Sequence, residues 1–414
     1  MNWRWFKKKI GTVQPRESSF VKKYWRVFLT AILLFAFLTR IYGIAGPSEY
    51  YFDEIYHAFT AREYLHKNPD AWVWYGKPPK GRAYEWVHPP MAKLLMAASM
   101  WVFGETPVGW RMPGVLLGVG SVMFVFLIGD GLFKNKTIGL LAAAFFALDG
   151  LPLVLSRIGT NDGTFLFFTL GTIYFFIKNR YLFSSLFFGL AASTKLSFIW
   201  IPFVVVLLFF TLRKRWEKNL LWYAVIPPIV YLASFAPFFT IGHTWSELIE
   251  LHRQMFWYHT HLEATHPFSS PWWSWPLMLK PTWLFTQSQN GLISNIYAQG
   301  NPVVFWFGLV AILVLLCVAV ATNRRELWAV LIAYGGLFIP WSLSPRIMFL
   351  YHYLPSVPFL SLALAWLLMS NKHWRKTAII FLVLALLLFA WLYPRWIGIP
   401  VTESFNKLYY WLPA

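Results

Sequence analysis

The chain has 414 residues, of which 58% are hydrophobic and 13% are Asp, Glu, Lys or Arg, and its formal net charge is +19. Soluble globular domains carry about 25% charged residues, so this composition excludes an ordinary water-soluble fold. The Lys and Arg residues fall in short clusters between apolar runs, which is typical of membrane topology and argues against a nucleic-acid partner. The single cysteine, Cys317, excludes an internal disulfide and a cysteine-based metal site.

Repeated apolar runs have close to the roughly 20 residues that a helix needs to cross a hydrocarbon core of about 30 Å. We therefore predict an all-α polytopic membrane protein with about eleven transmembrane helices, at residues 25–44, 108–130, 137–155, 162–178, 182–196, 197–212, 219–241, 301–321, 327–343, 347–369 and 375–393. The apolar stretch Met91–Gly104 is shorter, and we predict that it is interfacial or re-entrant rather than spanning.

The first 24 residues are basic, and we predict that they are cytoplasmic and that the first run is an uncleaved signal anchor. With this orientation each cytoplasmic piece carries at least two Lys or Arg residues, and these pieces hold 21 of the 36 in the chain. The positive-inside rule is then satisfied, and both long loops, 45–107 and 242–300, lie outside the cytoplasm. Loops of this length are usually functional.

The chain accordingly divides into five parts. We predict a cytoplasmic N-terminus (1–24), a transmembrane catalytic module (25–241) that includes loop 45–107, a second extracytoplasmic loop (242–300), a C-terminal four-helix module (301–393) and an extracytoplasmic tail (394–414). Repeated halves are frequent in transporters, and the sequence shows no internal repeat.

An acidic pair, Asp53-Glu54, lies near the start of the first long loop. Such a pair is more often solvated charge than a catalytic site, but other ionisable residues lie at the outer ends of the predicted helices: Arg111, Arg157, Asp162, Lys195, Arg346 and His352. An ionisable residue at membrane depth costs roughly 2.5–3.5 kcal/mol on insertion scales, which favours a functional role. A group of cations there is suited to a lipid phosphate; for Arg111 and Arg346 the alternative is snorkelling to headgroups.

The second long loop is rich in histidine and tryptophan. The spacing of its histidines matches no compact metal-ligand motif, so we interpret them as ordinary loop residues: His243, His259, His261 and His266. Its tryptophans form either an interfacial belt or a platform on which a sugar stacks, and both readings stay open for Trp272, Trp273 and Trp275.

Short motifs follow one another along residues 50–360. They are Phe52–Tyr56 with Ala58, His88–Lys93, Gly109–Gly114, Leu148–Gly150, Ser156–Ile158 with Asp162, Ala192–Lys195, His266–Trp273, Gly300–Pro302, Arg346–Phe349 and Tyr351–Pro355. On these motifs the sequence resembles the protein O-mannosyltransferases of the membrane superfamily GT-C, which uses polyprenyl-phosphate sugars. Eukaryotic members carry a sugar-binding-like domain before the eighth span, and residues 242–300 are too few to hold it. The resemblance is therefore to the short bacterial form, which implies a plasma membrane.

The resemblance implies a GT-C fold and inverting transfer of mannose from a polyprenyl (dolichyl-type) phosphate to Ser or Thr hydroxyls of exported proteins. It implies three partners, namely the lipid-linked donor, the acceptor polypeptide and the bilayer, with the protein export machinery as a further candidate. The active site would face away from the cytoplasm. No cofactor and no divalent metal are expected, because a phosphate held by cations is already a good leaving group.

A single displacement needs a base behind the attacking hydroxyl and charge stabilisation on the leaving phosphate. We assign the base to Asp53, with Glu54 orienting the acceptor or holding nearby cations. The donor phosphate and sugar are assigned to His88, Lys93, Arg111, Arg157, Asp162, Lys195, Arg346, His352 and Tyr353. We expect His266 and Trp273 to contact the sugar or the acceptor.

Two other functions fit parts of the sequence. A related polyprenyl-phosphate-sugar transferase could act on a lipid or a cell-wall glycan, and aminoarabinose transferases share the polar first loop. The His-Pro-Pro-x-x-Lys and Tyr-His-Tyr-Leu-Pro stretches favour a protein acceptor. A transporter or lipid flippase would need polar residues at mid-depth in its spans, whereas here they gather at helix ends.

Overall fold

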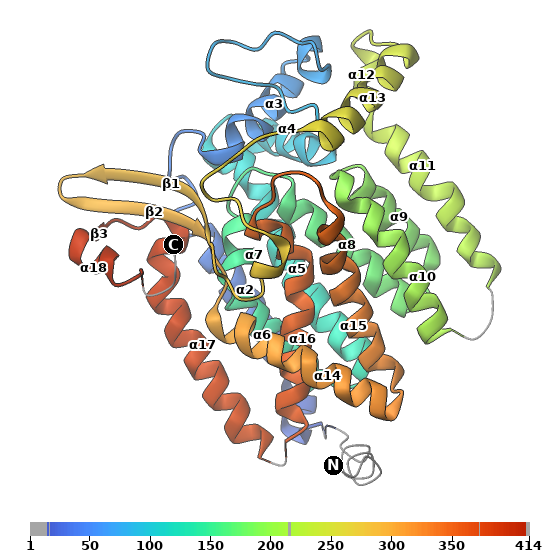
Figure 1. The fold of residues 1–414 in the computed structure, drawn as a ribbon, viewed down its shortest axis with the longest axis vertical. Helices are drawn as coiled ribbons and strands as arrows, with labels where there is room; N and C mark the ends of the chain where they lie inside the picture. The colour runs from blue at the N-terminus through green and yellow to red at the C-terminus, as the bar shows by residue number, and fades with distance from the viewer. Residues whose placement is uncertain (1–14, 16, 214–216, 372, 411–414) are drawn as a thin grey trace.

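The computed structural model describes residues 15, 17–213, 217–371 and 373–410. The basic residues from Arg4 to Arg16, which contribute to the predicted orientation, lie outside the described residues. The helices form one bundle (Figure 1). The start of α2 (Ser19–Ile41) lies at one end, and α3 (His57–Leu65) and α13 (Trp245–His261) lie at the other, which we call the loop end.

Capping residues explain where several helices of the N-terminal half begin. Pro107 stands in the first turn of α5, where its missing N–H costs nothing. The Asn135 side chain accepts hydrogen bonds from the backbone of Thr137 and Ile138 and so caps the next helix. This half comprises α5 (Pro107–Phe133), α6 (Lys136–Ala147), α7 (Gly150–Leu155), α8 (Asp162–Ile177), α9 (Tyr181–Ala192), α10 (Trp200–Leu212), α11 (Trp222–Ser234) and α12 (Ala236–Thr240).

The C-terminal half surrounds one central segment. It comprises α14 (Gly308–Thr322), α15 (Arg325–Phe338), α16 (Val357–Met369) and α17 (Trp374–Ile397). In the apolar window of Leu350–Met369, 89% of the residues are buried inside the protein, compared with 17% in α2 and 22% in α17. The segment around α16 is therefore the centre of the bundle, and α2 and α17 present their apolar side chains outward, as lipid-facing helices do.

Each predicted apolar run contains a helix, and six described helices are long and apolar enough to cross a membrane. Other apolar helices among the described residues have only 10–17 residues, so the count of eleven spans stays a prediction. Some runs are shortened by interruptions: the run 137–155 is divided between α6 and α7 at Leu148-Asp149.

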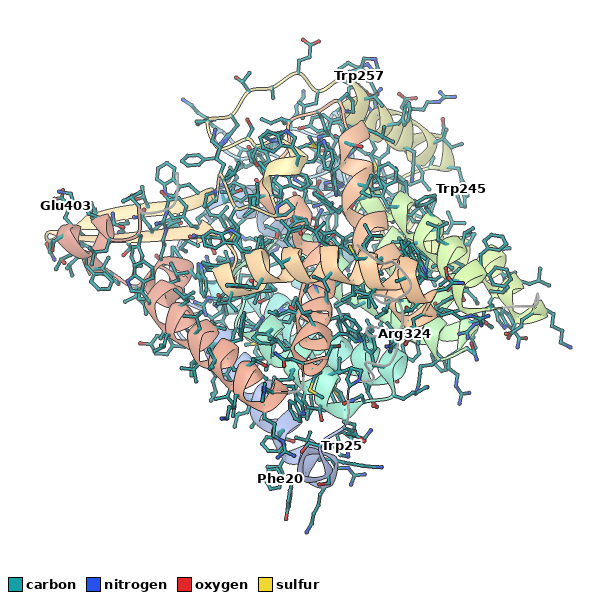
Figure 2. All side chains as sticks on the ribbon, turned by 60° about the horizontal axis from the view of Figure 1, so that its bottom comes forward. Phe20, Trp25, Trp245, Trp257, Arg324 and Glu403 are labelled. Carbon is teal, nitrogen blue, oxygen red and sulfur yellow. The ribbon has the colours of Figure 1, made fainter. Side chains whose placement is uncertain are left out.

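Exposed aromatic side chains lie toward both ends of the bundle. Figure 2 labels Phe20 and Trp25 near the start of α2, and Trp245 and Trp257 on α13. Phe20, Trp245 and Trp257 are 61%, 59% and 55% exposed. Aromatic residues at two such levels are typical of the two interfaces of a membrane protein.

A buried polar junction joins the two halves. The Asp149 carboxylate accepts hydrogen bonds from the backbone N–H of Leu151 (3.0 Å) and of Asn301 (2.8 Å). The Asn301 amide in turn donates to the carbonyls of Leu148 (3.0 Å) and Ala385 (2.9 Å), the latter in α17. Every one of these groups is satisfied, which a buried polar network requires.

The two long loops pack against each other at the loop end. The first contains η1 (Phe52–Ile55), α3, η2 (Pro69–Trp72) and α4 (Met91–Phe103). Phe59 and Trp72 of this loop share a buried cluster with Phe238 and with Leu251 of α13. The first loop is therefore held in place by the second.

A small antiparallel sheet projects from the bundle, and the sequence analysis did not predict it. It consists of β1 (Thr282–Gln289), β2 (Leu292–Ala298) and β3 (Val401–Thr402), in the order β1-β2-β3. Asn290-Gly291 joins β1 to β2 with φ angles of 53° and 74°. Two positive φ angles define the type I′ hairpin turn, for which Asn-Gly is the preferred sequence. The Asn290-Gly291 dipeptide is the feature of the sequence that indicates this hairpin.

Candidate active site

The acidic pair of the first loop consists of two carboxylates with different surroundings. Glu54 is fully buried. Its Oε1 accepts from Arg111 Nε (2.7 Å) and from the backbone N–H of Gly159 (2.8 Å), and its Oε2 accepts from Arg111 Nη2 (2.8 Å). A bidentate pair of this kind fixes orientation as well as charge. Glu54 therefore holds η1 against α5 and is not available as a base.

Arg111 is occupied in the same way. Besides Glu54 it donates to the carbonyls of Ile44, Pro47 and Glu49, so all five N–H groups of the guanidinium have acceptors. The geometry does not favour the phosphate-binding role predicted for Arg111, because no donor remains for a ligand.

Arg157 also has a structural use. Its Nη1 donates to the carbonyls of Thr39, Arg40 and Tyr42 at 3.3, 2.5 and 2.7 Å. These are carbonyls at the C-terminal end of α2, which lack partners within the helix. Arg157 thus caps α2, and the sequence could not reveal this contact across more than a hundred residues.

Asp53 differs from its neighbour. No hydrogen bond to its carboxylate is found among the described residues, and the side chain is only partly exposed. Burial, and after it the charge of Asp162, raises the pKa of Asp53 to about 7, while Lys195 and Arg346 oppose the shift. These influences put Asp53 in one neighbourhood with three of the other predicted site residues. A carboxylate with a pKa near neutrality is suited to accept a proton.

Lys195 and Asp162 form the first cationic element of this neighbourhood. Lys195 Nζ donates to Asp162 Oδ1 at 2.6 Å, and both side chains are mostly buried. Asp162 opens α8, and Lys195 follows α9 and lies 5.8 Å from the ring centroid of Tyr351. A lysine ammonium has three N–H donors, so Lys195 keeps two beyond the ion pair.

Arg346 is the second cation in the neighbourhood of Asp53. Its guanidinium donates to Nδ1 of His259, while His259 Nε2 contacts the Val87 carbonyl at 2.9 Å. Burial lowers the pKa of His259 to about 4, so its ring is neutral and accepts at Nδ1. Arg346 Nε is buried without a partner, and no carboxylate is in ion-pair contact with Arg346 among the described residues. A partly buried cation with a buried orphan donor is suited to binding an anion.

Histidines from the first loop line the same region. The rings of His57 and His88 stack at 6.4 Å, and His88 lies 5.0 Å from His259. Burial lowers the pKa of His57 and His88 well below the usual value, so both are neutral. The Nδ1 atoms of His57 and His88 are buried without a hydrogen-bond partner among the described residues, and His57 Nδ1 lies 3.8 Å from Glu85 Oε2.

Lys93 is fully used by its own loop. It forms a buried ion pair with Glu85 and also donates to the carbonyls of Glu85 (2.7 Å) and His88 (2.9 Å). Its three N–H groups are thereby satisfied. Lys93 therefore fixes the return of the first loop and is not free to bind a donor phosphate as predicted.

His352 and Tyr353, the last two residues predicted to bind the donor, differ in whether a polar atom is left for a ligand. His352 Nδ1 contacts both the backbone N–H (3.2 Å) and the backbone carbonyl (3.1 Å) of Phe349, and its ring lies against Trp341 and Tyr351. This leaves Nε2 for a ligand. Tyr353 is fully buried, and its hydroxyl contacts that of Tyr334 at 2.8 Å. The geometry does not favour a donor contact for Tyr353.

The predicted acceptor residues are exposed. His266 lines a surface groove of about 510 Å³ together with Ser269, Pro271 and Met348. Trp273 is 56% exposed. Both positions are open to a ligand, and their roles stay predictions.

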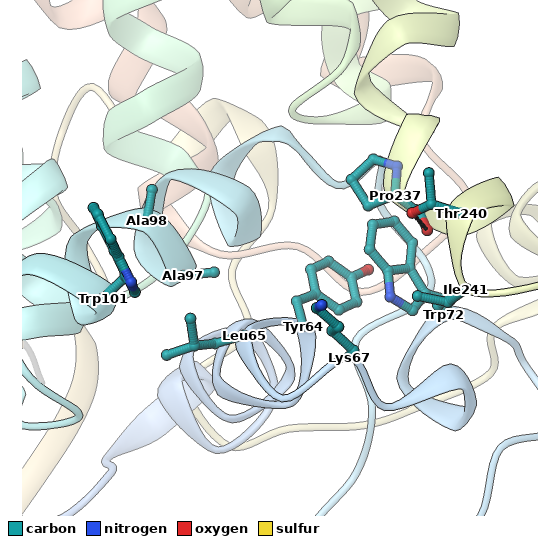
Figure 3. A pocket seen from close by; sticks show the side chains of 10 residues that line it. All are labelled: Tyr64, Leu65, Lys67, Trp72, Ala97, Ala98, Trp101, Pro237, Thr240 and Ile241. Carbon is teal, nitrogen blue, oxygen red and sulfur yellow. Dashed lines mark hydrogen bonds between the residues drawn. The ribbon is translucent and has the colours of Figure 1, made fainter.

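A second cavity, of about 520 Å³, lies between the first loop, α4 and α12. Figure 3 shows Trp101 of α4 on one side and Tyr64, Trp72, Pro237 and Ile241 grouped on the other. Its lining is mostly apolar and includes none of the predicted site residues.

Sequence reasoning missed several contributors. His57, His259 and Tyr351 face the Asp53 neighbourhood, and only Tyr351 lies in a quoted motif close to an assigned residue. The second-loop histidines were interpreted as ordinary loop residues; His259 is an exception because folding brings it to Arg346. No group of three or more His, Cys, Asp or Glu among the described residues is arranged to hold a metal ion.

Two family models match the chain. Residues 87–240 match the model described as dolichyl-phosphate-mannose-protein mannosyltransferase. Residues 244–414 match the model of the C-terminal four TMM region of protein-O-mannosyltransferase. Together they span the candidate site from His88 onward.

Individual relatives agree in length. The chain is 26% identical to the polyprenol-phosphate-mannose–protein mannosyltransferase of Mycolicibacterium smegmatis, over 93% of this chain and 92% of the relative. Its fold matches a subunit of the S. cerevisiae Pmt1-Pmt2 protein O-mannosyltransferase complex bound to the sugar donor, with a TM-score of 0.80 at 15% identity, covering 98% and 94% of the chains. ArnT from Cupriavidus metallidurans bound to undecaprenyl phosphate matches with a TM-score of 0.60 at 17% identity, covering 86% and 62%.

Proposed function

Because the chain belongs to the protein O-mannosyltransferase family, we propose that it transfers mannose from a polyprenyl phosphate to Ser or Thr hydroxyls of exported proteins. It is a multi-pass membrane glycosyltransferase with the GT-C fold that its sequence predicted. The family relationship supports a lipid-linked mannose donor and a protein acceptor.

The proposed reaction is one displacement at the anomeric carbon with inversion. Asp53 accepts the proton of the acceptor hydroxyl while the hydroxyl oxygen forms the new bond to the anomeric carbon of the sugar. The bond from the anomeric carbon to the phosphate oxygen breaks, and the lipid phosphate leaves with its electron pair. Lys195 and Arg346 bind that phosphate and stabilise the charge that develops on it.

The observation that supports these roles best is the contrast in hydrogen bonding around Asp53. Its carboxylate has no donor among the described residues, and Arg346 has an unpartnered buried Nε. A site with an unused base and an unused cation is incomplete without a substrate. A phosphate near Arg346 and a hydroxyl near Asp53 would satisfy both.

The remaining predicted residues take supporting roles in this proposal. Glu54 and Arg111 hold η1 so that Asp53 faces the cations, and Lys93 holds the segment from Glu85 to His88. Asp162 orients Lys195. His88, His352, His266 and Trp273 are candidates to contact sugar or acceptor, and Arg157 and Tyr353 stabilise the fold. No divalent metal takes part in the proposed step.

We place the enzyme in a plasma membrane with its N-terminus in the cytoplasm and the loop end outside. The distribution of Lys and Arg supports this orientation. Acceptors would reach the loop end as they leave the export machinery, which is the proposed source of unfolded substrate.

The test is direct transfer. Purified enzyme in lipid nanodiscs is mixed with radiolabelled polyprenyl-phosphate-mannose and a Ser/Thr peptide, and label on the peptide is measured. We expect α-linked product from a β-linked donor, or the reverse, because the displacement inverts. No label on any peptide, with label on a lipid or glycan acceptor instead, would refute the protein-acceptor assignment.

A further inference from the structure

The strand β1 is the open edge of the small sheet. β2 lies between β1 and β3, and no other strand pairs with β1 in the described part of the chain. The outer half of β1, Thr286–Gln289, pairs regularly with Leu292–Asn295 and has all four side chains exposed. Figure 1 shows this hairpin projecting sideways from the bundle.

This edge lacks the usual protection. Edge strands in soluble proteins are normally blunted by a charged residue, a proline or a bulge, because a row of free N–H and C=O groups pairs with other chains. Thr286–Gln289 reads Thr-Gln-Ser-Gln, without charge or proline. The register irregularity lies further in, between Trp283 and Phe285.

The turn fixes which main-chain groups face outward. In a hairpin closed by a two-residue type I′ turn, the pair that flanks the turn exchanges both ladder bonds, and the next pair exchanges none. The flanking pair here is Gln289 with Leu292, and the next is Ser288 with Ile293. Ser288 and Thr286 therefore point their N–H and C=O groups away from β2.

The inner end of β1 reaches the candidate active site. The ring centroid of Phe285 lies 5.7 Å from that of Tyr51. Tyr51 precedes Asp53 by two residues, a chain length of at most about 7 Å. The neighbouring Trp283 contacts Phe268 at 5.4 Å, within the segment that forms the His266 groove.

We propose that the open edge of β1 binds the acceptor polypeptide as an added strand and so leads its Ser or Thr toward Asp53. The proposal rests on the proposed function. Four residues of edge span about 13 Å, enough to hold a short extended segment. Main-chain pairing supplies affinity without reading side chains. The uncharged edge accepts acidic and basic segments equally.

The first experiment uses the unaltered enzyme. A ten-residue peptide with one central Ser is prepared with a single backbone N-methyl group at each other position in turn, and KM is measured for each. Strand addition uses only alternate N–H groups of the peptide, so KM should rise at every second position on one side of the Ser. KM values without this period of two would overturn the proposal.

The second experiment compares two variants of one residue. Ser288→Pro removes an outward N–H and places a ring on the edge, which edge strands tolerate. Ser288→Ala is the matched control, since it removes the side-chain hydroxyl and keeps the backbone N–H. We expect peptide KM to rise roughly fivefold for Ser288→Pro, from the loss of one hydrogen bond, and to stay unchanged for Ser288→Ala, with the donor KM constant in both.

The outcomes separate the two proposals. If the unaltered enzyme labels no peptide at all, the proposed function fails. If it labels peptides but Ser288→Pro and Ser288→Ala behave alike and the N-methyl series shows no alternation, the edge proposal alone fails. A changed oligomeric state for Ser288→Pro with unchanged peptide KM would assign the edge to a second copy of the chain and overturn it.

Discussion

Asp53 and Glu54 are adjacent in sequence and opposite in their surroundings. Glu54 has a bidentate partner and two further contacts, whereas the Asp53 carboxylate has no hydrogen bond among the described residues. The same difference separates the cations, since every N–H of Arg111 is used and Arg346 keeps an unpartnered Nε. Groups whose hydrogen bonds are all made within the protein hold the site together, and groups with unused hydrogen-bonding capacity are left for the substrate. Each prediction below acts on one side of this contrast.

The largest effect is expected on catalysis, from changing Asp53, whose carboxylate has no hydrogen-bond partner in the described part of the chain. Asp53→Asn removes the base with little change in shape, so kcat should fall by roughly 10²–10⁴-fold while the folded fraction is unchanged. The check is label transfer together with thermal unfolding in detergent. Near-normal kcat would remove Asp53 from the mechanism.

Changes to the fully hydrogen-bonded pair Glu54 and Arg111 should lower the stability of the folded protein. Glu54→Gln leaves the buried Arg111 charge without its partner, and breaking a buried ion pair costs about 3–5 kcal/mol. Thermal unfolding should shift downward by more than for any other variant here. The double variant with Arg111→Gln is the control, because removing both charges should be less harmful than the sum of the two single changes.

Arg346→Gln should weaken donor binding without unfolding the protein. Arg346 has no carboxylate partner in ion-pair contact, so its loss leaves no orphaned acid behind. The loss of one charge-assisted contact predicts a roughly 10–100-fold rise in donor KM or fall in kcat/KM. Arg253→Gln on exposed α13 is the matched control, and equal effects in both would contradict the phosphate role.

The pH dependence should show the raised pKa of Asp53. With a pKa of about 7, kcat/KM should rise with pH up to about that value and fall roughly tenfold per unit below it. Stability should move the other way. The folded protein holds this proton between the usual pKa and about 7, so stability falls as pH rises through that window. Asp53→Asn should accordingly unfold at a higher temperature than the unaltered protein at pH 8; an unchanged or lower temperature would contradict the raised pKa.

The smallest expected effect is that of chelation. EDTA should leave the transfer rate unchanged, because cationic side chains are proposed to stabilise the leaving phosphate. Loss of activity that Mg²⁺ or Mn²⁺ restores would show that the cation set around Asp53 is incomplete without metal.

The sequence predicted what depends on local pattern. Apolar runs located the helices, and the short motifs located Asp53, Lys195 and Arg346, which the structure brings into one neighbourhood. Whether the hydrogen-bonding groups of each residue are used within the protein could not be predicted from the sequence. Arg111 is saturated by carbonyls more than sixty residues away, and such carbonyls leave no trace in side-chain identity.

The sheet was missed for a different reason. The membrane composition predicts an all-α fold, and the Asn290-Gly291 hairpin signal lies in the second loop, outside the apolar runs on which that prediction rests. The irregular spacing of His259 to the other histidines predicts no metal site and gives no other signal. Its relevant partner is Arg346, 87 residues away, which only the fold brings near.

The junction of Asp149 and Asn301 has a consequence for biosynthesis. Asp53 is synthesised early, but its surroundings include Arg346, and the junction needs the Ala385 carbonyl of α17. Until the ribosome has delivered that helix to the membrane, the Asn301 amide has the Leu148 carbonyl but lacks its second acceptor in an apolar setting. A nascent chain halted before α17 would therefore carry an unfinished junction between the two halves of the bundle.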